Sequence, residues 1–391
     1  MVSHPRHGLA EIGRPLSRLD LAAGWPCGPD FEAGSLPSRA ARARQGLEEV
    51  IADHLARGPC AVSFSGGRDS SAVLAVAVHV ARREGLGLPV PLTLDFPDDA
   101  RSREDEWQEK VVRHLGVTDW QKVDPDGGAG LLSPAARRSL HGAGLLWPHN
   151  AYLHLPLADE IPGGTLLTGL EGDGLFGGWR WSHANDVLAR RRRPTPRDAT
   201  RLALAAAPAS VRRLWLRRSA GTTALTWLRP TAHAAFTRRL VEERSREPAR
   251  WDQRVHWWAR RRYHRIAAAS LEAVGRITGT RIAHPFLDPR FLAALSREGG
   301  RWGYGDRTEV MRALVGDLLP DAVLARRSKA NFTATVWDAP VREFARAWDG
   351  TGVDTTLVDP DELRRVWLLD RPIAPSGTLL HAAWLHQQGT S

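Results

Sequence analysis

A glycine-containing loop between two apolar segments places the strongest constraint on how this chain can fold. Residues 65–70 read Ser-Gly-Gly-Arg-Asp-Ser, after a short apolar run at 61–64 and before a longer one at 70–80. This order predicts a strand, a tight turn and a helix. Glycines let main-chain N–H groups turn inward, and the positive end of the helix dipole lies at the same point. Such a loop is suited to bind an anion.

The side chains of this loop suit a phosphate group. Ser65 and Ser70 would add hydroxyl donors to the amides of the turn. Asp69 would place a carboxylate where a phosphate-bound metal ion would lie. The loop is not a Walker A loop, which needs a Gly-x-x-x-x-Gly-Lys-Ser/Thr spacing. The simpler alternative is a strand-to-helix turn that happens to use these residues.

Hydrophobic periodicity divides the chain into an alternating part and a helical part. We expect strands at residues 61–64, 90–96, 119–123 and 165–168, and helices at 41–54, 70–83 and 104–115. This alternation predicts an α/β fold, a parallel sheet with helices on both faces. From residue 186 the pattern is almost entirely helical. We therefore expect an irregular lead-in over residues 1–40, an α/β core over 41–185 and a helical C-terminal part over 186–391.

The composition is that of a globular protein. Hydrophobic residues make up 42% and charged residues 25% of the 391 residues, so a large core can form. No apolar run is long enough to span a membrane, and the first residues lack the apolar stretch of a secretory signal. Cys27 and Cys60 make neither a disulfide framework nor a cysteine-rich metal site. We therefore expect a cytoplasmic protein.

Positive charge is concentrated in one segment. Between Arg180 and Arg265 there are 22 arginines and six acidic residues, while the whole chain has a net charge of +10. The segment could bind an anionic partner such as substrate phosphates, an acidic peptide or nucleic acid. It could equally be a solvated helical surface, because arginine is the usual cation of this chain and only three lysines occur.

A second glycine-rich loop follows the strand expected at 165–168. Residues 168–178 read Thr-Gly-Leu-Glu-Gly-Asp-Gly-Leu-Phe-Gly-Gly. Its glycines permit a close approach of the backbone to a ligand. Ligands of parallel sheets bind beyond the carboxyl ends of the strands, where both loops would lie. Asp173 would then share Mg²⁺ with Asp69, since this ion takes one or two carboxylates together with phosphate oxygens.

Four segments of the chain resemble a known family in the order expected for it. The loop at 65–70 is similar to that of the N-type ATP pyrophosphatases (PP-loop enzymes). The loop at 168–178, the His-Pro-Phe-Leu-Asp of 284–288 and the Arg-Arg-Ser-Lys-Ala-Asn-Phe of 326–332 are similar to motifs of the asparagine synthetase family. The resemblance covers about residues 40–345. It implies the PP-loop fold and a ligase that cleaves ATP between its α- and β-phosphates.

The resemblance also implies where ATP would bind. The expected contacts are the phosphate loop, two strand ends near adenine and a segment near the ribose: Ser65, Gly66, Gly67, Asp69 and Ser70; Ser63 and Leu94; Thr168 and Gly169. Mg²⁺ would lie between the two aspartates already named. Lys329 would balance the charge that develops on the phosphates, for which a compact ammonium is suited.

Several other residues are candidates for the catalytic base or for a structural role. Glu171 is a candidate for the base that takes the proton of the attacking amine, and His149, His154 and His284 are alternatives. We expect Asp288 to cap the helix that follows it.

The chain departs from the family pattern in two respects. When the loops are aligned on residues 175–178, Leu170 and Gly174 stand where the family has acidic residues, and Glu171 is one position away from the first of these. Only 64 residues precede the ATP loop, and residue 2 is Val2, so a glutaminase domain with its cysteine is not expected. The amine would then be ammonia, either free or supplied by a partner protein, or an amine of the substrate itself, as in β-lactam synthetases and lasso-peptide macrolactam synthetases.

These observations favour an ATP-dependent ligase that adenylates a small-molecule or peptide carboxylate and passes the acyl group to an amine. One alternative is a family member that binds ATP or a partner but has lost catalysis, as the changes at Leu170 and Gly174 would permit. Another is a nucleic-acid-modifying enzyme, for which the arginine-rich segment with Trp215, Trp257 and Trp258 is the only support. We rank nucleic acid as the least expected partner, and we expect no membrane.

Overall fold

A single parallel sheet organises the fold. The computed structural model describes residues 16–29, 36, 42–96, 104–125, 127–177, 179–218, 224–326 and 333–389. Within these residues five strands pair in the order β3-β2-β1-β4-β5, all parallel. The strands are β1 (Cys60–Ser63), β2 (Val90–Leu94), β3 (Gln121–Val123), β4 (Thr165–Leu167) and β5 (Arg281–Ala283).

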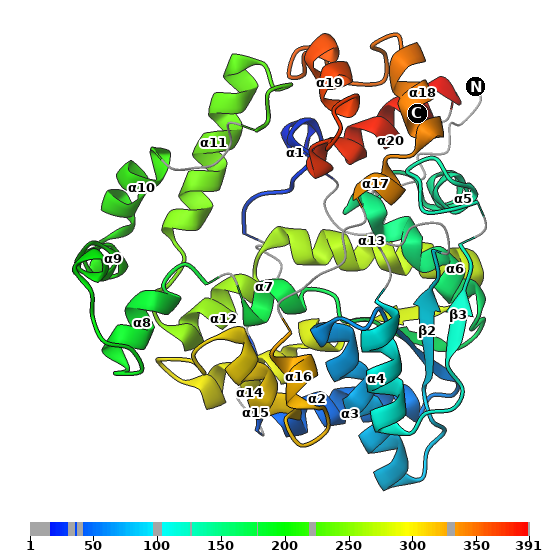
Figure 1. Ribbon diagram of the computed structural model, residues 1–391. Helices are drawn as coiled ribbons and strands as arrows, with labels where there is room; N and C mark the ends of the chain where they lie inside the picture. The colour runs from blue at the N-terminus through cyan, green and yellow to red at the C-terminus, as the bar shows by residue number, and fades with distance from the viewer. Residues whose placement is uncertain are drawn as a thin grey trace.

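Helices form most of the remaining structure (Figure 1). Those before β4 are α1 (Arg18–Ala23), α2 (Ala43–Leu55), α3 (Arg68–Glu84), α4 (Asp105–Leu115), α5 (Pro134–Ala143), η1 (His149–Leu153) and α6 (His154–Asp159). Between β4 and β5 lie α7 (Gly172–Phe176), α8 (Ser182–Leu188), α9 (Pro196–Ala206), α10 (Ala209–Arg217), α11 (Pro230–Ser245), α12 (Trp251–Ala259) and α13 (Arg262–Thr278). After β5 come η2 (Pro285–Leu287), α14 (Pro289–Gly299), α15 (Arg307–Val315), α16 (Asp321–Leu324), α17 (Thr333–Val336), α18 (Ala339–Ala347), α19 (Pro360–Trp367), η3 (Ala374–Ser376) and α20 (Gly377–Gln387).

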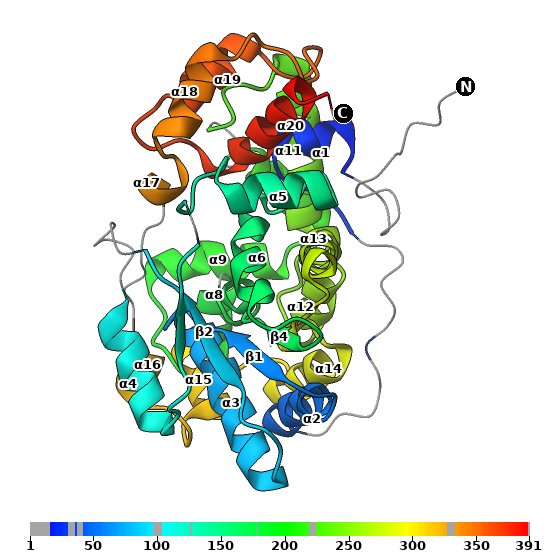
Figure 2. The same ribbon diagram turned by 90° about the vertical axis from the view of Figure 1, so that its right-hand side faces the viewer.

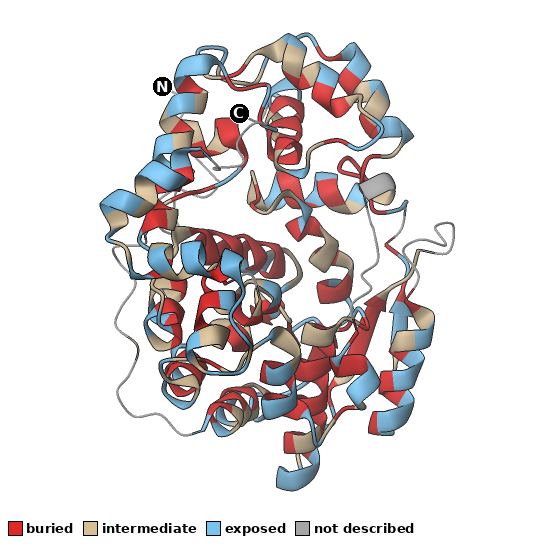
Figure 3. Cartoon of the chain, turned by 60° about the vertical axis from the view of Figure 1, so that its left-hand side comes forward, coloured by how far each residue is buried: buried red, intermediate tan, exposed pale blue. Residues whose placement is uncertain are grey.

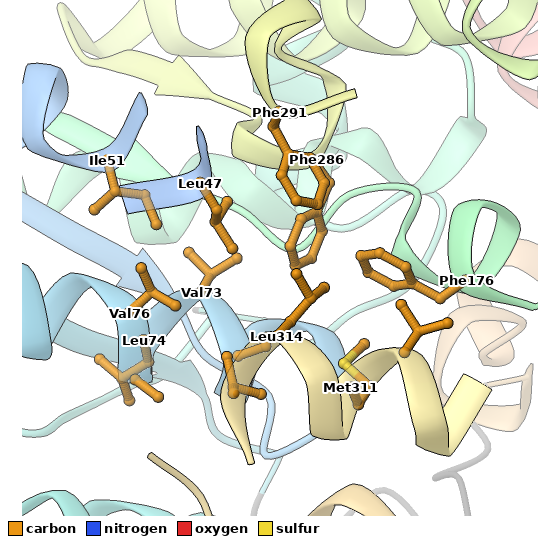
Figure 4. Close-up of a cluster of buried hydrophobic side chains, with 14 of the residues drawn as sticks. Leu47, Ile51, Val73, Leu74, Val76, Phe176, Phe286, Phe291, Met311 and Leu314 are labelled. Carbon is orange, nitrogen blue, oxygen red and sulfur yellow. The ribbon is translucent and has the colours of Figure 1, made fainter. Parts of the chain in front are cut away.

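Both faces of the sheet are buried against helices. Successive strand residues point to opposite faces, and neighbours in β1 and β4 accordingly belong to different apolar clusters. Val62 and Leu167 join the cluster formed with α2, α3, α14 and α15, whereas Ala61 and Leu166 join the one formed with α5, α6 and α13. Figure 4 shows the first cluster, in which Phe176 packs edge-on against Phe286 at a ring distance of 5.0 Å. Burial on both faces explains the almost unbroken apolar runs of the strands.

The α/β part and a second group of helices lie at opposite ends of the molecule. In Figure 2 the sheet lies with α2 to α4, α14 and α15 in the lower half, and α18 to α20 lie with α1 in the upper half. Helices α8 to α11 form a column along one side (Figure 1). Buried residues concentrate on the strands and on the inward sides of the surrounding helices (Figure 3). No helix among the described residues has the length and apolar character needed to cross a bilayer.

The predicted α/β fold is confirmed, and the four expected strands are present within two residues of their predicted starts. Several elements were not expected from the sequence, α5 among them, and two of these need an explanation. The segment taken as entirely helical contains β5, whose three residues are too short for an alternating pattern to be seen. The lead-in contains α1, which a capping box between Ser17 and Asp20 begins and Gly24 in the left-handed region ends. The boundary at residue 185 stays a prediction.

Candidate active site

The loop between β1 and α3 forms a turn that is suited to bind an anion. Gly67 is the N-cap of α3 and has no side chain to accept from the first-turn amides, so these donors remain available to a ligand. The backbone N–H of Ser65 donates to Ser70 Oγ at 3.2 Å, and that of Gly67 donates to Ser65 Oγ at 3.3 Å. Gly66 has φ +77°, and a Cβ there would lie 2.8 Å from Gln108 Cγ. The turn therefore requires glycine at this position.

The loop after β4 packs directly on the first turn of α3. A Cβ at Gly169 would lie 2.8 Å from the backbone N of Ser70, and one at Gly172 would lie 2.3 Å from Asp69 Cγ. Both distances are shorter than real Cβ contacts allow. β1 and β4 are neighbours in the sheet although β2 and β3 follow β1 in the chain, so the two loops meet where the strand order switches. Glycine at these two positions brings the loops into contact.

Arg307 bridges the two aspartates of this junction. Its Nη2 lies 2.7 and 2.6 Å from the two carboxylate oxygens of Asp69, and its Nη1 binds Asp173 Oδ1. Burial raises the pKa of Asp69, and the guanidinium opposes this shift. The side chain of Asp69 is 15% exposed and that of Asp173 54%. The pair therefore lies at the mouth of the site, with a positive group between its members.

This arrangement fits a divalent cation that also binds phosphate. A guanidinium shared by two carboxylates marks a position where positive charge is stabilised. Among the described residues no group of three or more histidine, cysteine and acidic side chains could hold a metal ion by itself. Mg²⁺ needs no such cage, because it completes its shell with water and substrate phosphates. Asp69 and Asp173 have the donor chemistry for it.

Glu171 is held in a strained and partly buried position. Its backbone has φ +69°, which is uncommon for a residue with a side chain. Burial raises the pKa of its carboxyl to about 7, although Tyr263 Oη donates to Glu171 Oε2 at 3.3 Å and favours the ionised form. His264 Nδ1 lies 3.4 Å from the same oxygen, and burial keeps the pKa of His264 well below its usual value. The carboxyl can therefore gain or lose a proton near neutral pH.

Gly174 leaves room for the carboxylate of Glu171. A Cβ at position 174 would lie 2.9 Å from Glu171 Oε2 and 3.2 Å from Trp258 Nε1. The buried guanidinium of Arg254 donates to the carbonyl oxygens of Gly174 and Leu175, each at 2.6 Å, and fixes the backbone of α7. The glycine at 174 and the shifted acidic residue at 171 are thus related, because the carboxylate of Glu171 lies in the space beside the residue that lacks a side chain at 174.

The remaining expected contacts lie at the same edge of the sheet. Ser63 and Leu94 are the last residues of β1 and β2. Thr168 directly follows β4 and is buried, with its Oγ1 2.7 Å from His284 Nδ1. The alternative bases are enclosed: burial lowers the pKa of His149 and His154 to about 4 and that of His284 to about 3.

Arg326, the first residue of the fourth motif, contacts the phosphate loop. Arg326 is buried, pairs with Glu104 and donates to the carbonyl oxygen of Gly66 at 3.0 Å. Its guanidinium also lies 4.9 Å from the ring centre of Trp107. Lys329 lies outside the described residues. Asp288 caps α14 by accepting from the backbone N–H of Arg290 at 2.8 Å, as predicted.

Sequence reasoning missed three side chains of this site. Arg307 belongs to no quoted motif and is one of 51 arginines, so no signal singled it out. Tyr263 lies 92 residues from Glu171 and gave no signal either. Arg326 was within a quoted motif, but its buried partner Glu104 could be identified only from the structure.

The chain was also compared with known proteins. The sequence profile of the family named asparagine synthase matches residues 42–383, which is most of the chain. No curated protein matches the sequence. The matched range contains both glycine loops, Arg307 and the fourth motif. The chain therefore belongs to the asparagine synthase family.

Proposed function

We propose that this member of a family of ATP-dependent amide-forming ligases adenylates a substrate carboxylate, releases pyrophosphate and transfers the acyl group to an amine. The main support is the junction of the two glycine loops. It joins a helix N-terminus suited to phosphates, two aspartates suited to Mg²⁺ and a carboxyl group with a pKa of about 7.

The residues around the junction have chemistry suited to each part of the nucleotide. In this proposal the amides of the loop and the hydroxyls of Ser65 and Ser70 bind the phosphates. Adenine lies near Ser63 and Leu94, and the ribose lies near Thr168 and Gly169. Mg²⁺, held by Asp69 and Asp173, would neutralise phosphate charge.

The proposed reaction has two steps. An oxygen of the substrate carboxylate attacks the α-phosphorus of ATP, and the bond to the bridging oxygen of the β-phosphate breaks, so that pyrophosphate leaves. The amine nitrogen then attacks the acyl carbon, the carbon–oxygen bond to AMP breaks, and the amine loses a proton. Glu171 is the proposed acceptor of that proton, because a base works best when its pKa is close to the working pH.

Lys329 is the proposed source of positive charge for the departing pyrophosphate. The support is the anchoring of Arg326, three positions earlier, on the carbonyl oxygen of Gly66 in the phosphate loop. A compact ammonium close to developing negative charge stabilises it without needing the planar geometry of arginine.

The decisive experiment measures AMP and pyrophosphate formed from ATP with Mg²⁺. Candidate acceptors are aspartate with ammonia and a panel of peptide carboxylates with internal amines. The variants Asp69→Asn, Asp173→Asn and Lys329→Arg should each lower pyrophosphate release at least about 100-fold. Lys122→Arg is the control, because Lys122 is an exposed lysine whose partner, Asp105, is not among the proposed ATP or Mg²⁺ contacts.

Each outcome has a clear meaning. Pyrophosphate release that depends on all three residues would support the adenylating ligase. Near-normal turnover in Lys329→Arg would refute the role of that lysine, and a defect in only one aspartate variant would refute a shared metal ion. ATP binding without turnover on any acceptor would favour a family member that has lost catalysis.

A further inference from the structure

A large cavity lies outside the proposed nucleotide site. Its volume is about 850 Å³, and it is bounded by residues 27–29 and by side chains of α10, α11, α12 and the start of α13. Among the described residues, eight arginines line it against two glutamates: Arg213, Arg217, Arg238, Arg239, Arg246, Arg260, Arg261 and Arg262; Glu242 and Glu243. The cavity is therefore strongly positive.

Both glutamates of the lining already have partners within the protein. Glu242 pairs with Arg213 at 2.8 Å and with Arg246 at 2.7 Å. Glu243 pairs with Arg261 and accepts from the backbone N–H of Gly28 at 2.6 Å. These contacts hold the walls together and leave no acidic group of the lining for the other arginines.

Three of the lining arginines have no acidic or carbonyl partner among the residues that the structure describes. Arg239 and Arg262 are bound by the buried carboxylate of Asp20. In the described part of the chain no acidic group or carbonyl pairs with Arg217, Arg238 or Arg260, which are exposed. Their guanidinium groups are free to bind an external anion, and their fork geometry matches the oxygens of carboxylates and phosphates.

The cavity also has apolar walls. Cys27, Val241 and Trp257 line it, and the guanidinium of Arg261 lies 5.2 Å from the ring centre of Trp257. Apolar walls with a few placed charges are typical of sites for organic molecules of moderate size. A bare ion would leave most of this surface unused.

One wall of the cavity connects to the candidate base. The guanidinium of Arg261 lies 4.5 Å from the ring centre of Tyr263 and within 3.5 Å of its hydroxyl. That hydroxyl donates to Glu171. Two contacts therefore join the arginine-lined cavity to the carboxylate that would accept the proton of the amine.

We propose that this cavity binds an anionic arm of the ligase substrate, an organic group with two or more carboxylate or phosphate units. The inference rests on the proposed function, because it assigns the substrate of that same site. The positive charge of the lining arginines favours an anion, and the apolar walls favour a ligand with an organic framework. The contact with Arg261 and Tyr263 keeps the rest of the molecule near Glu171. An acidic peptide or a phosphorylated small molecule has this chemistry.

Binding can be tested without knowing the substrate. Calorimetric titrations would use pentaglutamate and inorganic tripolyphosphate on the full chain, saturated with Mg²⁺ and an ATP analogue that cannot be cleaved between its α- and β-phosphates. The double variant Arg238→Gln/Arg260→Gln should weaken binding at least about tenfold, as expected for the loss of two charge-assisted hydrogen bonds. Arg218→Gln is the matched control, because Arg218 is exposed at the end of α10 but does not line the cavity.

The outcomes distinguish a carboxylate arm from a phosphate arm, and they test this inference separately from the proposed ligase activity. A tenfold loss for pentaglutamate alone identifies a carboxylate arm, and a loss for tripolyphosphate alone identifies a phosphate arm. Equal binding in the double variant and the wild type would overturn the inference. So would tighter binding of single-stranded RNA through the same arginines. Absence of pyrophosphate release in the separate activity assay would overturn the proposed ligase. The effect of the arginine substitutions on anion binding could still be measured in that case.

Discussion

Glu171 gives the site a dependence on pH that a single hydroxyl group tunes. If its carboxylate is the base, the rate of amide formation should rise with pH through about 7. Tyr263 donates a hydrogen bond that favours the ionised form, so Tyr263→Phe should raise the pKa of Glu171 and shift the acid limb to higher pH. The pH profile of single-turnover amide formation measures this shift. Tyr304→Phe, at a half-buried tyrosine whose hydroxyl has no hydrogen-bond partner among the described residues, should leave the profile in place.

The same carboxylate should cost stability. Its pKa is raised in the folded protein from 4.5 to about 7, so the folded state binds the proton more tightly and stability falls as pH rises through this interval. Glu171→Gln should therefore raise the free energy of unfolding at pH 8, by up to about 3 kcal/mol. The gain should disappear near pH 4.5. Denaturant unfolding at both pH values tests this against Glu160→Gln, an exposed control. An equal effect of the two substitutions at pH 8 would refute the assignment of a buried charge.

Arg307 should make the protein less dependent on Mg²⁺ for its stability. Removing the guanidinium in Arg307→Met leaves two carboxylates facing each other, and the variant should be less stable without metal. Mg²⁺ should then raise its melting temperature more than that of the wild type, by roughly 2 °C or more. Arg312→Gln on the same helix, which breaks exposed pairs with Glu309 and Asp321, is the control. If Mg²⁺ affects both variants alike, the aspartates do not share an ion.

Part of this site followed from the sequence and part did not. Asp69 and Asp173 could be paired in advance because each follows a strand that ends at the same edge of a parallel sheet. Arg307, which binds both, comes from α15 and has no sequence pattern of its own. The relation of Gly174 to Glu171 was equally hidden, since the sequence shows only a missing acidic residue and not the space beside it.

At the scale of elements, α1 is held by a buried carboxylate. Asp20 is fully buried, pairs with Arg262 and accepts from the backbone N–H of Ser17 at 2.9 Å. Asp20→Asn should lower the free energy of unfolding by about 3–5 kcal/mol, because it leaves a buried guanidinium without its partner. Asp354→Asn removes an exposed pair with Arg18 and should cost less than about 1 kcal/mol. Comparable losses in denaturant unfolding would contradict this difference.

Two of the elements that escaped prediction, β5 and α1, are short. β5 has three residues and α1 has six, so each contains fewer than two repeats of a hydrophobic pattern. Both depend on tertiary partners: β5 pairs with β4 along its length, and α1 packs against α11 and α20. The long helices such as α3 and α4 were recognisable from their own sequences. α3 contains a long apolar run, α4 has apolar residues at helical spacing, and each helix ends at a glycine.

At the scale of the whole molecule, the sheet couples two apolar clusters. β1 and β4 contribute neighbouring residues to both clusters, so neither cluster can lose its packing without exposing the sheet. We therefore expect unfolding in one cooperative transition. Far-ultraviolet and near-ultraviolet circular dichroism should give the same denaturant midpoint. Separate midpoints would show that the α/β part and the group of α1 and α18 to α20 unfold independently.

The contacts of α1 also fix an order of events during synthesis. Trp227 Nε1 donates to the carbonyl oxygen of Ala22 at 2.8 Å, Trp147 Nε1 donates to that of Gly24 at 3.0 Å, and a Cβ at Gly24 would overlap the carbonyl oxygen of Pro375. A ribosome adds about 5–20 residues per second, so Pro375 emerges tens of seconds after α1. For that interval α1 lacks its contact with Pro375 and stays without part of its native packing.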